Sequence, residues 1–103
     1  MMPEPSLTPT MEVVSAALPG AEIVEAGIAD LRHGRETAAA LLVSIGATRL
    51  AAVGCEIAEP FADPEHRLYA LLARSNPDAA HGRYNALIRR LVSYERAAEC
   101  VAR

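Results

Sequence analysis

The sequence predicts an all-α fold, arranged as an up-down-up-down four-helix bundle with space for a short fifth helix at the N-terminus. Apolar residues recur at spacings of three and four over long stretches, as they do on one face of a helix. A capping residue directly precedes proline at three places, a frequent helix start: Thr8-Pro9, Asp63-Pro64 and Asn76-Pro77. With one Phe, three Tyr and no Trp, the core is expected to be built mainly from Leu, Ile, Val and Ala, which suit closely packed helices.

One domain is expected over residues 1–103, because a chain of this length buries a single core and has no room for a second. Residues 1–7 are expected to form a disordered tail. The short N-terminal helix would begin at Thr8 and end at Pro19-Gly20. The next helix, from Ala21 to about His33, has a clear apolar stripe and a C-terminal glycine at Gly34.

The third predicted helix spans Glu36 to Val53 and leaves open whether it runs through Gly46. A break at Gly46 would resemble a helix-turn-helix corner, so DNA binding by residues 36–53 is one alternative. Its second helix would be short, however, and would carry only Arg49 as a basic residue. A glycine that allows close helix crossing is therefore the preferred interpretation.

The rest of the chain predicts a loop and two further helices. Cys55 to Ala62 is expected to form the loop, with Ile57 and Phe61 as its apolar anchors. A helix then runs from Pro64 to about Arg74. The final helix, Ala79 to Arg103, has the longest apolar stripe, formed by Tyr84, Leu87, Ile88, Leu91, Tyr94, Ala98 and Val101.

Charge is unevenly distributed along the chain. The net charge is −3, which argues against a general nucleic-acid binder. Residues 1–65 hold ten of the 13 acids, whereas residues 66–103 hold seven of the ten arginines. The simplest interpretation is an uneven but solvated charge mixture, and the alternative is attraction of an acidic partner or head-to-tail docking of two copies.

Two cysteines, Cys55 and Cys100, are too few for a disulfide framework. No signal peptide pattern and no apolar run long enough to cross a membrane is seen, so a cytoplasmic protein with free thiols and no membrane contact is expected. Phosphate-loop and nucleophile motifs are absent, and no cofactor is expected.

Each aspartate is followed three residues later by a histidine, a spacing that places both side chains on one helix face. The helical wheel turns His33 and His66 away from the apolar stripes, so no metal site is expected inside the bundle. A surface or intersubunit site from Asp30, His33, Asp78 and His81 is the remaining metal candidate. The polar run from His81 to Asn85 is the densest functional-looking stretch, and His81, Arg83 and Asn85 could hold an anion at a helix start.

Two functional hypotheses follow. The favoured one is a small interaction module without a catalytic motif, with a second copy or another protein as its partner. Its expected homodimer interface is the outer face of the last helix: Ala86, Arg89, Arg90, Ser93, Arg96, Ala97 and Cys100. The alternative is an enzyme, or a ligand or metal sensor, that combines the His81 to Asn85 cluster with Asp30 and His33.

One internal contact is also predicted. Glu95 is the only charged residue within the apolar stripe of the last helix, and Arg49 holds the equivalent position in the helix from Glu36 to Val53. A buried charge without a partner is strongly destabilising. The two side chains are therefore expected to form a buried ion pair.

Overall fold

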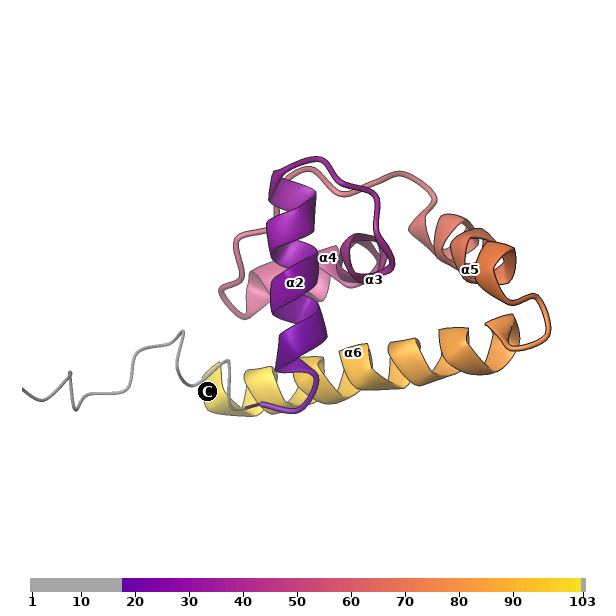
Figure 1. Cartoon of the computed structure of the whole chain (residues 1–103). Coiled ribbons are helices and arrows are strands. Elements are labelled where there is room, and N and C mark those ends of the chain that lie inside the picture. Colours follow the sequence, from indigo (N-terminus) through magenta and orange to yellow (C-terminus); the bar gives the residue numbers. More distant parts are fainter. Residues whose placement is uncertain (1–17, 103) are drawn as a thin grey trace, which may run out of the picture.

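The computed structural model describes residues 18–102, and these residues form five α-helices and no strand. The helices, labelled in Figure 1, are α2 (Ala21–Arg32), α3 (Ala38–Ile45), α4 (Ala47–Ala52), α5 (Pro64–Ser75) and α6 (Ala80–Ala102). The all-α class is thus confirmed for the described part of the chain. The predicted N-terminal tail and most of the predicted helix that begins at Thr8 lie outside the described residues.

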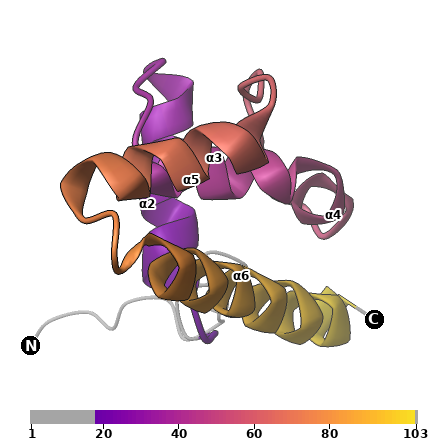
Figure 2. The ribbon, with the colours of Figure 1, turned by 90° about the vertical axis from the view of Figure 1, so that its right-hand side faces the viewer.

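The helices cross one another at steep angles. In Figure 1, α2 stands across α6 and α3 is seen end on, whereas Figure 2 shows α3 lying between α5 and α4 with α6 below. The up-down-up-down bundle is therefore not confirmed. The reason lies in α3, which packs against α2, α5 and α6 although it has only eight residues.

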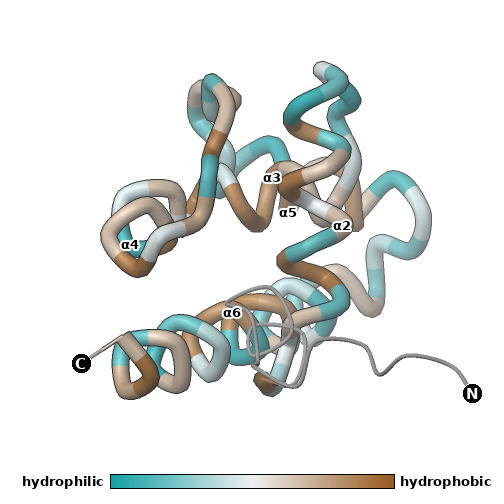
Figure 3. Tube along the Cα trace, turned by 90° about the vertical axis from the view of Figure 1, so that its left-hand side faces the viewer, coloured by the Kyte–Doolittle hydropathy of each residue, from teal (hydrophilic) through white to brown (hydrophobic). Residues whose placement is uncertain are grey.

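The central position of α3 follows from its sequence. Ala40, Leu41, Leu42 and Val43 are four consecutive apolar residues, and each is fully buried. A helix that is apolar all round must be covered on all sides, which a bundle of stripe-bearing helices does not provide. In Figure 3, by contrast, hydrophobic and hydrophilic residues alternate along α2 and α6, as expected for helices with one apolar face.

Glycine allows α2 to cross α3 closely. A Cβ atom on Gly27 would lie 2.2 Å from the carbonyl oxygen of Ala39 and 2.5 Å from Cγ2 of Val43. Neither distance is compatible with a side chain at this position. Gly27 is therefore the residue that sets the distance between these two helices.

The link between α2 and α3 is longer than predicted. Gly34 has a φ of 71°, as expected for a glycine that follows a helix. However, α3 starts at Ala38, because the Thr37 side chain accepts a hydrogen bond from the Ala40 N–H at 3.1 Å and so caps the helix there. The predicted start at Glu36 was therefore two residues too early.

Gly46 combines both predicted roles, since it separates α3 from α4 and also lies against α6. A Cβ atom here would come within 2.5 Å of Oε2 of Glu95 and within 3.1 Å of Cδ1 of Leu91. The break lets the short helix α4 take its own direction (Figure 1). The absence of a side chain leaves room for the Glu95 carboxylate.

The segment between α4 and α5 is anchored as predicted, since Ile57 and Phe61 pack against the core. The buried Ser44 hydroxyl adds a polar anchor: it donates to the Ala40 carbonyl oxygen at 2.8 Å and accepts from the Phe61 N–H at 3.1 Å. This loop is therefore held to the central helix at a defined point.

Candidate functional site

A cluster of three charged side chains joins α4 to α6. Nη1 of Arg49 lies 3.0 Å from Oε1 of Glu95, while Nε and Nη2 of Arg49 donate to the two carboxylate oxygens of Glu99 at 3.0 and 2.9 Å. The Arg49 guanidinium thus pairs with two carboxylates at once, and it binds that of Glu99 in a bidentate geometry.

The structure brings Arg49 and Glu95 together, but it does not bury both. The Glu95 side chain is 4% exposed and that of Arg49 is 46% exposed. The helix break at Gly46 explains the difference, because α4 lies at the edge of the core and its Arg49 reaches Glu95 from the solvent side. The predicted pair did not include Glu99, although its spacing of four from Glu95 places both carboxylates on one helix face.

Burial raises the pKa of Glu95, and the nearby Glu99 carboxylate adds to that increase, whereas Arg49 opposes it. Hydrogen bonding to Glu99 in turn raises the pKa of Arg49. The cluster is therefore a structural link in which Arg49 favours the charged form of a buried carboxylate and burial opposes it.

The helix-turn-helix alternative receives no support from this geometry. The second helix of the supposed motif, α4, has six residues, and Arg49 is its only basic side chain. Since the guanidinium of Arg49 is held by Glu95 and Glu99, it is not available for phosphate or base contacts.

The predicted interface residues are on the surface of α6. Six of the seven are exposed, and Ala97 is half-buried. We call this set the α6 outer face: Ala86, Arg89, Arg90, Ser93, Arg96, Ala97 and Cys100. Within residues 18–102, Arg90 is the only arginine of this face with an ion-pair contact, to Glu22 at 3.7 Å.

The polar run at the start of α6 is mostly exposed. Nδ2 of Asn85 lies 3.2 Å from Nε2 of His81, and Arg83 points to solvent. One backbone N–H just before α6 already has a partner in the preceding turn, because the Ala79 N–H donates to Oδ1 of Asn76 at 3.2 Å. Nothing in this arrangement adds a buried group that would select an anion.

Asp30 and His33 are used locally. Asp30 accepts hydrogen bonds from Thr37 at 2.8 Å and from Arg35 at 3.2 Å, and the Thr37 hydrogen bond is the main reason that the pKa of Asp30 is lowered. His33 Nδ1 lies 2.9 Å from the Ala29 carbonyl oxygen. These contacts cap the C-terminal end of α2 and hold the segment between α2 and α3 in place.

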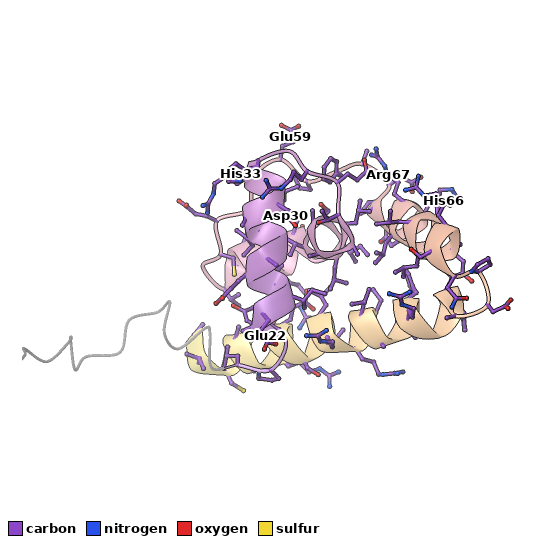
Figure 4. All side chains as sticks on the ribbon, in the orientation of Figure 1. Glu22, Asp30, His33, Glu59, His66 and Arg67 are labelled. Carbon is purple, nitrogen blue, oxygen red and sulfur yellow. The ribbon has the colours of Figure 1, made fainter. Side chains whose placement is uncertain are left out.

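The structure separates the two halves of the proposed enzyme or sensor site. The C-terminal end of α2, where Figure 4 labels Asp30 and His33, lies on the opposite side of the molecule from the start of α6. Within residues 18–102, no group of three or more His, Cys, Asp or Glu side chains could hold a metal ion. Asp30, His33, Asp78 and His81 therefore do not form a metal site within one molecule.

The surface also has a shallow hollow that sequence analysis did not predict. It has a volume of about 270 Å³ and is lined by Arg32, Glu56, Ile57 and Ala58. The lining contains one cation and one carboxylate but no side chain suited to nucleophilic attack. It resembles a surface depression more than the enclosed, largely apolar sites that bind small molecules.

No helix within residues 18–102 is both long and apolar enough to cross a membrane. Comparisons of the chain with protein-family models, with curated proteins and with solved structures found no match.

Proposed function

We propose that this protein is a small interaction module that self-associates through the α6 outer face. The observation that carries this proposal is the group of exposed arginines along one helix. In α6, Arg83, Arg89 and Arg96 are exposed and form no ion pair within the described residues, and Arg90 has only a 3.7 Å contact with Glu22. Elsewhere in the described residues Arg35, Arg49 and Arg67 pair with a carboxylate of their own molecule, whereas Arg32 and Arg74 are exposed single arginines on separate helices.

The shape of the face supports docking of a second protein surface. Ala86, Ser93 and Cys100 are small and exposed, and they lie close together on the wheel of α6, opposite its buried stripe. Small side chains allow a partner to approach the helix closely, and the neighbouring arginines supply charge-assisted hydrogen bonds. The face extends along the longest helix of the described chain.

The test is the solution mass, measured by size-exclusion chromatography with light scattering over a range of protein concentrations. The wild-type protein is expected to exceed the monomer mass of 11.0 kDa as concentration rises. Ser93→Arg, which adds a long charged side chain at the centre of the face, is expected to remain monomeric.

Ser75→Arg is the matched control, since Ser75 is an exposed serine at the end of α5 and lies outside the face. This variant is expected to associate as the wild type does. A wild-type protein that stays monomeric at every concentration would overturn the proposal, and so would association that survives in Ser93→Arg.

A further inference from the structure

The α6 outer face carries charge of one sign. Arg89, Arg90 and Arg96 are exposed along it, and Arg83 extends the basic surface toward the start of the helix. Only Arg90 has a carboxylate nearby within the described residues, Glu22 of α2 at 3.7 Å. The only carboxylates of α6, Glu95 and Glu99, both contact Arg49 of α4. No acidic residue of α6 therefore offsets the arginines of this face.

This charge disfavours a two-fold dimer in which the face packs against itself. In such an isologous interface the same patch comes from both copies. Arginines of one copy would then approach arginines of the other, and like charges brought together without counter-charges oppose association. The face requires an acidic surface as its partner.

The molecule has such a surface along the segment that joins α4 to α5. Glu56, Glu59 and Asp63 are exposed, and none of them forms an ion pair within residues 18–102. We call these three residues the acidic edge.

The figures place Glu59, the middle residue of the acidic edge, away from α6. Figure 4 labels Glu59 at the top of the molecule, whereas α6 lies at the bottom with its outer face turned away from the core. Arg67, which Figure 4 also places near the top, is paired with Glu36 at 3.0 Å and so leaves the edge with excess negative charge.

From this arrangement we infer that the protein associates head to tail, with the α6 outer face of one copy docked on the acidic edge of the next. The inference rests on the proposed function and specifies its partner surface. Because the face and the edge are different parts of the molecular surface, the contact is heterologous and leaves one face and one edge free in every pair. The assembly then grows into larger rings or open chains.

A complementation experiment tests this geometry. The face variant Arg89→Glu/Arg96→Glu and the edge variant Glu56→Arg/Glu59→Arg change only exposed side chains. Each is expected to be monomeric on its own, because each lacks one of the two surfaces. An equimolar mixture is expected to form a complex of two chains and no larger species, because each variant retains one intact surface.

Light scattering of the separate and mixed variants decides between the possible outcomes, and circular dichroism with thermal unfolding checks that both variants are folded. The wild-type assembly is also expected to dissociate as salt is raised from low to several hundred millimolar, since exposed charges are screened over about 8 Å at physiological ionic strength. A mixture that stays monomeric while the wild type associates would overturn the head-to-tail geometry and leave self-association standing. A monomeric wild type would overturn both.

Discussion

At the scale of single residues, the contact between Arg49 and Glu95 has the clearest energetic meaning. A carboxylate that is 4% exposed loses most of its hydration, and burial accordingly raises the pKa of Glu95. For a group whose pKa is higher in the folded state, the stabilisation is present at low pH and is lost as pH rises through that pKa. Arg49 limits this loss because it stabilises the charged form.

Replacing Arg49 with Met therefore leads to a specific pH dependence. The variant is expected to be less stable than the wild type, and its deficit should grow as pH rises through the pKa of Glu95, where the buried carboxylate becomes charged without a cation. At lower pH a protonated Glu95 needs no cation, so the deficit should shrink. Chemical denaturation at a series of pH values measures the effect.

Two comparisons make this prediction specific. Arg96→Met removes an exposed arginine of α6, the helix that also carries Glu95. Arg96 has no ion pair within the described residues, so this variant should have nearly the stability of the wild-type monomer at any pH. In a Glu95→Gln background, Arg49→Met should destabilise less than in the wild type. Equal losses in the two backgrounds would show that the pair contributes nothing.

At the scale of helices, the close packing of α2 on α3 depends on the lack of a side chain at Gly27. Gly27 lies between α2 and α3, and the nearest atom to an added Cβ would be a backbone carbonyl oxygen at 2.2 Å. Backbone cannot rotate away as a long side chain can. The α2 and α3 helices would have to separate, and contacts around Val24 and Val43, both fully buried, would loosen.

Gly27→Ala is accordingly expected to destabilise the protein by about 3 kcal/mol or more, the upper part of the usual range for overpacking. Gly82→Ala is the matched control: this glycine lies within α6, is exposed and has open space around it. That substitution should stabilise the helix by up to about 1 kcal/mol. Thermal unfolding of the two variants compares them, and equal effects would contradict the close crossing.

At the scale of the whole molecule, the two thiols report on association. Cys100 is exposed on the α6 outer face, whereas Cys55 is half-buried with its sulfur 4.0 Å from the Tyr94 hydroxyl. Burial raises the pKa of Cys55 and so lowers its reactive thiolate fraction. The two positions should therefore respond differently to a thiol reagent.

In dilute protein, Cys100 is expected to react at least about tenfold faster than Cys55. At concentrations where the chain self-associates, labelling of Cys100 should slow, because the second copy then covers the α6 outer face. Mass spectrometry of Cys55→Ser and Cys100→Ser variants assigns each rate. Unchanged labelling of Cys100 in a demonstrated oligomer would place the interface elsewhere.

Sequence and structure contributed differently to these conclusions. The periodicity of apolar residues was sufficient to predict helices at α2, α5 and α6, and the cap-then-proline pattern located the start of α5 correctly. The outward position of six α6 outer face residues also followed from the wheel. Even the meeting of Arg49 and Glu95 was predictable, because a charge within an apolar stripe requires a partner.

The path of the chain through space was decided by tertiary packing. A stripe shows which side of a helix is apolar, but it does not show what covers that side. The four consecutive buried residues of α3 made this short helix the centre of the fold, and Gly27 and Gly46 set how closely its neighbours approach. Those contacts depend on steric fit between segments far apart in sequence. For this reason the charged surfaces of the molecule, and their separate placement, became visible only in three dimensions.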